Sequence, residues 1–410
     1  MQPIQLDGTT GEGGGQLVRV AVGLAALTTQ PVTITNVRGN RPGARGGGLK
    51  SQHVTSIAWL AEATGADVQG LSVGSKTLTF TPRRPPTELG RRRFRIAAES
   101  SAASTLLVLQ AILPFVLFAS NDAGEPVELE ISGGTNVAWS LSFEYLDQVL
   151  MPTLEERFGI TVERQLRKRG WSLGARSSGL VWFRVHPVPR GQTLQYRPPE
   201  QDARNSSDFF DVEKINVSIV VPGSAHDKLR ETLALRLGSH FPSADVFFNL
   251  VEDSGADSRW SVLLVAHSAG GVRWATDVLC SMPRQAKSRD GFIEQTVDSL
   301  CRELSDEVGL GGTVDERLQD QLVSFQALAA GLSSFPRNDG LSTSTDVVDD
   351  DALVRDEGGN GKLRKERMHE PFGHGSGHAQ TVRWVVGQLL PQVEFYNRGD
   401  FVRGVGYAIL

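Results

Sequence analysis

The first sequence feature that could support chemistry is a dense run of glycines with one carboxylate inside it. Asp7–Arg19 reads DGTTGEGGGQLVR, and Glu12 stands next to three successive glycines. Glycine lets a ligand or another segment approach the backbone closely. Residues 16–27 are apolar at helical spacing, so a helix should start just after the glycines. A helix N-terminus favours phosphate, but the run matches neither the P-loop nor the GxGxxG fingerprint, so a tight structural turn is the alternative.

A second cluster combines arginines with flexible backbone. Val37–His53 reads VRGNRPGARGGGLKSQH and contains Arg38, Arg41, Gln52 and His53. A planar guanidinium can donate two parallel hydrogen bonds to phosphate oxygens, so the arginines are candidate phosphate ligands. A solvated basic loop is the other interpretation.

Two further segments carry an acid and two histidines. Asp320 lies between amides at the start of a helical pattern, and residues 373–388 place His374 and His378 before an apolar helix. The spacing of the histidines is compatible with a metal, but no HExxH pattern or third ligand accompanies them. An imidazole nucleophile is the interpretation we prefer for one of them, against a histidine in a surface turn.

The elements that must position these residues follow an α+β pattern. Apolar residues alternate between periods of 2 and 3.6, which predicts repeated βα units with antiparallel strands mixed in. We expect strands at 32–37, 78–81 and 127–132, and helices at 51–64, 100–118 and 142–156.

A polar, proline-containing stretch at 193–214 indicates a boundary, after which a small βαββ module is expected. We predict a catalytic domain in two parts, 1–188 and 291–410, around an inserted α/β domain at 189–290. The acidic segment at about 336–366 is expected to be a disordered insertion.

Composition narrows the class of protein. The chain has 410 residues, of which 40% are hydrophobic and 22% are charged, as in ordinary globular proteins. A net charge of −5 argues against a broad, sequence-blind grip on duplex nucleic acid. Two cysteines, Cys280 and Cys301, cannot form a disulfide framework, and we expect an intracellular protein without a membrane span.

Taken together, the motifs resemble those of the RNA 3′-terminal phosphate cyclase family over nearly the whole chain. No single motif carries the resemblance, which rests on several in the right order. They are the Asp7–Arg19 run, the Arg38/Arg41 and Gln52/His53 pairs, a helix from Ser101 to Gln110, SGGT at Ser132–Thr135, DQL at Asp320–Leu322, and an HxQT-like segment at His378–Thr381.

The resemblance implies an enzyme that uses ATP to convert an RNA 3′-phosphate end to a 2′,3′-cyclic phosphate. A family histidine attacks the α-phosphorus of ATP, AMP passes to the RNA phosphate, and the 2′-OH displaces it. His378 matches this nucleophile, with Glu12 and Asp320 as further catalytic residues. A divalent metal, Mg or Mn, is also implied, but the sequence does not identify its ligands.

The resemblance also assigns binding positions. Gln110, Asp320, Gln321, Arg317 and Leu141 match the nucleotide site, and Arg19, Arg38, Arg41, Gln52 and His53 match the positions that hold RNA or ATP phosphates. Arg317 stands where the family tends to have an aromatic residue, and Leu141 replaces a common proline, so the adenine pocket is expected to differ. The segment at 169–180 also departs from the family pattern.

The implied fold is a set of repeated βα units around a pseudo-threefold axis, like that of EPSP synthase, with a smaller inserted domain. RNA 3′-phosphate ends are the implied partner; a homo-oligomer and a nuclear or cytoplasmic location stay open. One alternative is a non-catalytic cyclase-like factor in ribosome biogenesis, whose pattern lacks the nucleophilic histidine. A metabolite transferase like EPSP synthase is another, but it lacks the EGGGQ and HxQT residues.

Overall fold

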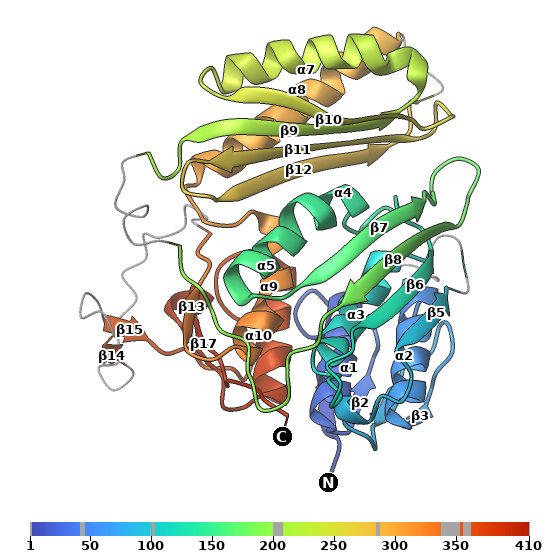
Figure 1. The fold of residues 1–410 in the computed structure, drawn as a ribbon, viewed down its shortest axis with the longest axis vertical. Coiled ribbons are helices and arrows are strands. Elements are labelled where there is room, and N and C mark those ends of the chain that lie inside the picture. Colours follow the sequence, from blue (N-terminus) through green and yellow to red (C-terminus); the bar gives the residue numbers. More distant parts are fainter. Residues whose placement is uncertain are drawn as a thin grey trace.

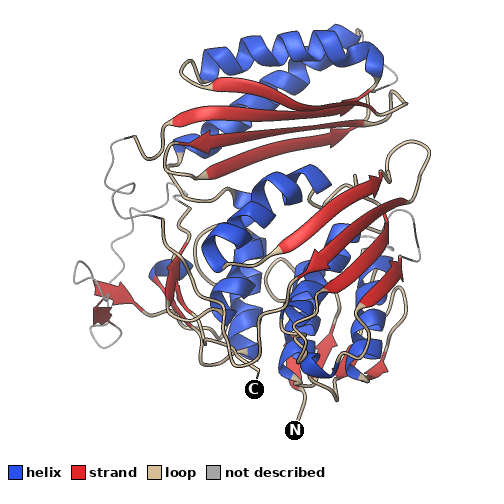
Figure 2. Cartoon of the chain, viewed as in Figure 1, coloured by secondary structure: helices blue, strands red, loops and turns tan. Residues whose placement is uncertain are grey.

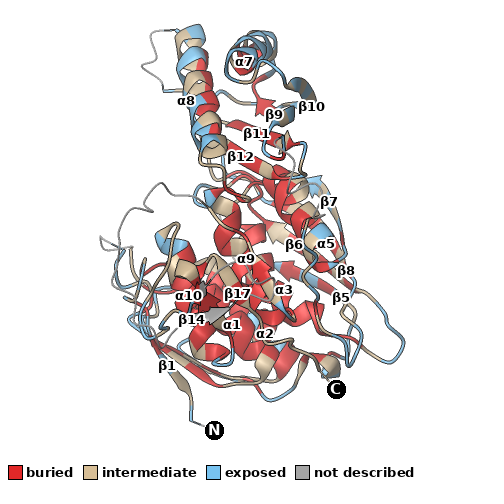
Figure 3. Cartoon of the chain, turned by 90° about the vertical axis from the view of Figure 1, so that its left-hand side faces the viewer, coloured by how far each residue is buried: buried red, intermediate tan, exposed pale blue. Residues whose placement is uncertain are grey.

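The computed structural model describes residues 2–41, 46–98, 100, 103–199, 208–283, 288–337, 353–355 and 362–409. Within them the chain mixes helices with several separate sheets, which confirms the α+β prediction (Figures 1 and 2). Buried apolar residues form two cores, a large one built from both ends of the chain and a smaller one between them. In Figure 3 the buried residues concentrate where helices α1, α3, α9 and α10 meet.

The first sheet has the strand order β1-β2-β4-β3, in which β1 and β2 are parallel and the other pairs are antiparallel. Helix α1 is apolar except for Gln16, Arg19 and its last residue, Thr28, and every residue from Gln16 to Leu27 is buried, as expected for a helix at the centre of a core. The elements are β1 (Ile4–Asp7), α1 (Gly15–Thr28), β2 (Val32–Thr35), α2 (Ser51–Thr64), β3 (Asp67–Gln69), β4 (Leu78–Thr81) and η1 (Pro86–Glu88).

The second sheet repeats this topology, with the order β5-β6-β8-β7 and one parallel pair, β5 with β6. Its first helix starts at Thr105, later than the predicted residue 100, because the Ser104 side chain caps it by accepting from the Leu107 N–H. The elements are β5 (Arg93–Ala97), α3 (Thr105–Leu117), β6 (Val127–Gly133), α4 (Phe143–Tyr145), the π-helical η2 (Leu146–Leu150), α5 (Met151–Phe158), β7 (Val162–Lys168) and β8 (Gly179–Val185).

A third sheet contains the last three strands of the same arrangement, in the order β13-β17-β16. A parallel bridge between Gln195 and Ala330, just ahead of β13, stands where the missing first strand would pair. The elements are α9 (Glu316–Leu328), β13 (Leu332–Ser334), α10 (Gly377–Leu389), β16 (Glu394–Tyr396), η5 (Asn397–Gly399) and β17 (Phe401–Arg403).

The smaller core belongs to a four-stranded sheet of order β10-β9-β11-β12, with α7 and α8 packed on one face (Figure 1). Apolar residues of α8 as far as Leu304 belong to this core, which therefore extends beyond the predicted boundary at residue 290. The elements are β9 (Val212–Val221), η3 (Gly223–Ala225), α7 (His226–His240), β10 (Asp245–Asp253), β11 (Trp260–Ser268), β12 (Arg273–Cys280) and α8 (Arg289–Gly309).

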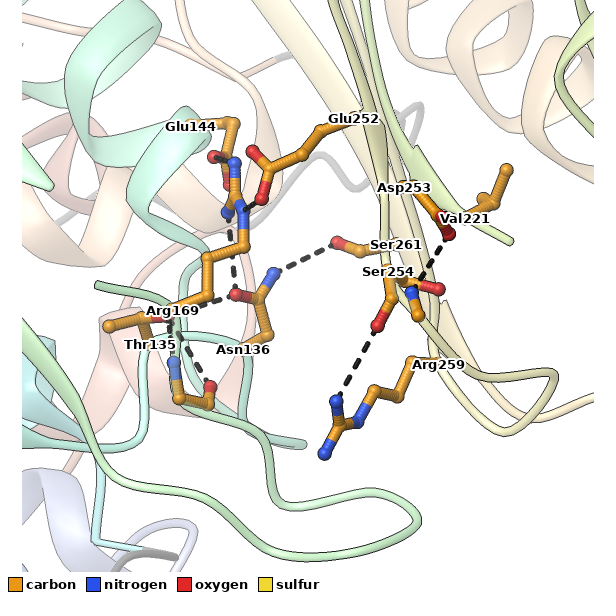
Figure 4. A network of polar contacts seen from close by, with 12 residues as sticks. Thr135, Asn136, Glu144, Arg169, Val221, Glu252, Asp253, Ser254, Arg259 and Ser261 are labelled. Atoms are coloured by element: carbon orange, nitrogen blue, oxygen red, sulfur yellow. Dashed lines mark hydrogen bonds and ion pairs between the residues drawn. The ribbon is translucent and has the colours of Figure 1, made fainter. Parts of the chain in front are cut away.

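The opposite face of this sheet rests on the rest of the protein. Leu263 and Val265 of β11 point into the large core, while Val262 and Leu264 point into the small one, as alternation along a strand requires. A polar network also crosses the junction (Figure 4). Arg169 there pairs at 2.7 Å with Glu144 and with Glu252 of β10.

Most of the acidic insertion predicted at 336–366 lies outside the described residues. Two short described pieces of it, β14 (Leu353–Arg355) and β15 (Lys362–Arg364), pair in an antiparallel manner. Among the described helices none is both long and apolar enough to span a bilayer. Cys280 and Cys301 are free thiols.

Candidate active site

A cleft of about 1430 Å³ lies between α1, α3, η2, α9, the start of α10 and the end of β12. These elements come from all parts of the sequence, including the inserted sheet, which contributes Asp277 and Leu279. The cleft brings together every residue that the sequence suggested for the site: Glu12, Arg19, Arg38, Arg41, Gln52, His53, Gln110, Leu141, Arg317, Asp320, Gln321 and His378.

The glycine run makes room for the side chains of the cleft itself. Gly13 has a φ of +59°, a left-handed conformation that favours glycine, and α1 begins two residues later. A Cβ on Gly14 would collide with the Glu12 carboxylate. A Cβ on Gly15 would lie 2.7 Å from both Arg19 Nη1 and His53 Nε2. The absent side chains therefore allow an acid, an arginine and a histidine to converge on one helix start.

Glu12 and His378 meet at the edge of the cleft, although 366 positions separate them in the sequence. His378 Nδ1 lies 3.3 Å from Glu12 Oε1, and the other carboxylate oxygen pairs with Arg41. The backbone N–H of Glu12 donates to Thr381 Oγ1 at 2.9 Å, which fixes the glycine run to the first turn of α10. His378 is the second residue of that helix rather than a residue of the preceding turn.

The ionisation of this pair is set by the contact between its members. The hydrogen bond that His378 donates to the Glu12 carboxylate raises the pKa of His378, and the negative charges of Glu12 and Asp320 raise it further, against the effect of partial burial. Burial alone would raise the pKa of Glu12, but the histidine and the two arginines outweigh it and hold that pKa below its usual range. Glu12 is therefore a carboxylate at neutral pH.

Deeper in the cleft, a carboxylate is held by amides. Gln16 Nε2 donates to Asp320 Oδ2 at 2.7 Å, and Gln321 Nε2 donates to the same oxygen at 3.0 Å. Gln110 Nε2 donates to Gln321 Oε1 at 2.8 Å, and Gln110 Oε1 accepts from Arg19 Nε at 2.6 Å. Burial raises the pKa of Asp320 to about 6 and lowers that of Arg19 to about 10.

His53 is a neutral imidazole, and one of its ring nitrogens is unpaired among the described residues. Its Nδ1 accepts the backbone N–H of Lys50 at 3.0 Å, so the proton resides on Nε2. That Nε2 is buried and has no hydrogen-bond partner among the described residues. Burial, together with the neighbouring Arg19 and Arg38, lowers the pKa of His53 well below its usual value. A phosphate oxygen in the cleft would satisfy this donor.

The cleft also has an apolar part, which suits a nucleobase. Leu141 and Arg317 also line the cleft, and Arg317 is paired with Asp277 of the inserted sheet. Its walls are Leu24, Leu106, Leu113, Pro114, Leu146, Leu150 and Met151.

Other residues were missed or placed elsewhere. Gln16 and Thr381 were visible in the EGGGQ and HxQT motifs but not singled out, and Asp277 gave no sequence signal. His374 faces Asp400, with Nδ1 3.6 Å from a carboxylate oxygen, so the two histidines do not converge.

Across the part of the chain that the structure describes, no three His, Cys, Asp or Glu side chains are grouped as metal ligands. Residues 42–45, 101 and 102 lie outside the described part.

Comparison with known proteins identifies the family. A sequence model of the RNA 3′-terminal phosphate cyclase family matches residues 10–350. This chain belongs to that family. An RNA 3′-terminal phosphate cyclase of Hyperthermus butylicus is 33% identical over 334 residues, which cover 80% of this chain and 85% of the relative. One from Methanosarcina mazei is 32% identical over 354 residues, 84% of this chain and 93% of the relative.

The family match covers most of the cleft but not all of it. Residues 10–350 include Glu12 and the three glycines after it, Arg38, Arg41 and the Asp320 network. His378 lies beyond the matched segment, so its place in the cleft rests on the contact with Glu12.

Proposed function

We propose that this family member converts RNA 3′-terminal phosphates to 2′,3′-cyclic phosphates at the expense of ATP, through a covalent adenylyl-histidine on His378. The observation that carries the proposal is the contact of His378 Nδ1 with Glu12 in a cleft lined by arginines and amides. The repeated strand order of the sheets supports the pseudo-threefold arrangement that the family resemblance implies.

His378 would act through its other ring nitrogen. A proton on Nδ1, directed at Glu12, leaves the lone pair on Nε2 free to attack phosphorus. Nε2 bonds to the α-phosphorus of ATP as the bond to the bridging oxygen breaks and pyrophosphate leaves. The RNA 3′-phosphate oxygen then attacks the same phosphorus and releases His378. Finally the 2′-OH oxygen attacks the activated RNA phosphate and loses its proton to solvent, and AMP departs with the bonding electrons.

The cationic wall would hold the phosphates in line for these steps. Arg19, Arg38 and the neutral His53 line one side of the cleft and would donate to phosphate oxygens. His53 needs no positive charge to bind a phosphate oxygen, because the neutral ring still carries a proton on Nε2 and can donate it in a hydrogen bond. Gln110 and Gln321 would contact the nucleotide, and Leu141 and Arg317, which also line the cleft, would contact the base.

Asp320 would hold in place the hydrogen-bond network of Gln16, Gln321 and Arg19 that lies deeper in the cleft than His378. Its Oδ2 holds Gln16 and Gln321, and Gln16 in turn accepts from Arg19. A divalent ion such as Mg²⁺ or Mn²⁺ would neutralise the triphosphate. Such ions are commonly bound by one carboxylate plus substrate phosphates. Glu12 is the carboxylate that lies beside His378 at the edge of the cleft. The residues present are therefore compatible with a metal that arrives with ATP.

A non-catalytic cyclase-like factor is the second candidate function. That class lacks the nucleophilic histidine, whereas the imidazole here is oriented by a carboxylate. We further propose that the protein works inside the cell, where RNA ends and ATP occur together.

The test is self-labelling with α-labelled ATP and a divalent metal. Wild-type protein should acquire a label that is acid-labile and alkali-stable, as expected of a phosphoramidate, and His378→Ala should acquire none. His369→Ala is the matched control, because that histidine is 67% exposed and lies outside the cleft. Wild-type protein that stays unlabelled, or a His378→Ala variant that labels normally, would contradict the proposal.

A further inference from the structure

One tryptophan stands fully in solvent at the cleft. Trp139 is 98% exposed, yet it belongs to the residues that line the cleft. Its φ of +65° is the left-handed conformation, which is a rare state for a bulky residue. A large apolar ring that the described residues leave almost fully exposed, on a backbone conformation unfavourable for it, needs an explanation beyond folding.

The loop that carries this ring is held on both sides. Ser140 Oγ lies 2.6 Å from Ser104 Oγ, the cap of α3. On the other side, the Ala138 N–H donates to Ser172 Oγ at 3.4 Å, and the Ser172 N–H donates to the Asn136 carbonyl at 3.2 Å. The exposed position of the ring is therefore imposed by its anchored neighbours.

A cation lies on the adjoining loop. Arg176 is exposed and also lines the cleft, and no ion pair or hydrogen bond is found for its side chain within the described residues. Its loop is fixed by Arg259, whose guanidinium donates to the Ala175 carbonyl and lies over the Trp171 ring. An exposed aromatic and an unpaired arginine on adjoining loops of one cleft are the combination that binds single-stranded nucleic acid, by stacking on a base and by contact with the backbone.

We propose that Trp139 stacks on a base of the RNA strand near its 3′ end, with Arg176 contacting the backbone phosphate beside it. This inference rests on the proposed function and adds a contact that holds the RNA end as a single strand. RNA is a better occupant than the adenine of ATP, because the apolar walls inside the cleft offer a base an enclosed site, whereas the Trp139 ring is open to solvent. Because every base has a π-face, the contact should be sequence-tolerant.

The experiment compares cyclisation kinetics of Trp139→Ala, Trp139→Phe and wild-type protein on a short single-stranded RNA with a 3′-phosphate. Loss of one base–aromatic stack should raise KM for RNA about 5- to 150-fold in Trp139→Ala, with most of the affinity kept in Trp139→Phe. Self-labelling by ATP should be unchanged. Phe247→Ala is the matched control, because this aromatic is 47% exposed on β10 and is outside the cleft.

A set of RNAs with an abasic site at successive positions from the 3′ end then identifies the stacked base. At that position alone, wild-type protein and Trp139→Ala should have equal KM values. An unchanged KM in Trp139→Ala, a penalty that persists on every abasic RNA, or a parallel loss of ATP labelling would each overturn the proposal. Direct binding of the labelled RNA is measured as well. If wild-type protein neither labels itself with ATP nor cyclises RNA, the proposed function fails. The ratio of the RNA dissociation constants of Trp139→Ala and wild-type protein still tests the Trp139 contact.

Discussion

Replacement of Asp320 by asparagine should stabilise the protein at neutral pH. Asp320 is 8% exposed, and burial raises the pKa of its carboxyl from 3.8 to about 6. The folded state therefore binds the proton more tightly than the unfolded state does. Stability contributed by this group is present below pH 3.8 and is lost as the pH rises through about 6.

The size of the effect follows from the two pKa values. They differ by about 2 pH units, and at about 1.4 kcal/mol per unit the ionised carboxylate costs the fold about 3 kcal/mol at pH 7. The asparagine side chain has nearly the same shape, and its carbonyl oxygen can still accept from Gln16 and Gln321. We therefore expect Asp320→Asn to raise the free energy of unfolding by up to about 3 kcal/mol at pH 7.

Urea denaturation of both proteins between pH 4 and pH 8 is the measurement. The two free energies of unfolding should converge near pH 4, where the wild-type carboxyl is protonated, and separate as the pH rises. Asp122→Asn is the control, because this carboxylate is 90% exposed and its ion pair with Arg190 contributes at most about 1 kcal/mol. A variant that is less stable than wild type at pH 7, or a difference that does not change with pH, would refute the reasoning.

Two other substitutions test the contacts of the site and of the junction. Glu12→Gln keeps an acceptor for His378 Nδ1 but removes the charge that raises the pKa of that imidazole, so the acidic limb of the pH profile for self-labelling should move to lower pH. An unmoved limb would show that Glu12 does not set this pKa. Arg169→Ala leaves the buried Glu144 without its partner and should lower the free energy of unfolding by about 3–5 kcal/mol in urea denaturation (Figure 4). Arg190→Ala, which breaks an exposed ion pair, is the control. If Arg169→Ala lowers the free energy of unfolding by no more than Arg190→Ala does, the expected role of Arg169 is contradicted.

Much of the fold was accessible from local patterns. The helix after the glycine run and the first three strands of the inserted sheet follow from apolar periodicity, which reports one element at a time. Other features were less accessible. Strand β12 was missed, and the start of α3 depends on which serine caps it. Strand orders and the packing of α8 on the inserted sheet are set by contacts between distant segments, which periodicity does not encode.

The sequence by itself determined the family and the kinds of side chain available to the site, because motif order and residue chemistry are local properties. Only the tertiary structure decided that Glu12 and His378 touch, that Asp320 is buried among amides, and that the inserted sheet supplies Asp277 to the cleft. The tertiary structure was also needed to show that Trp139 is exposed to solvent, because the exposure of a side chain depends on which other segments pack against it. The physical reason is that distances, burial and hence pKa values arise from all the segments packed around a group.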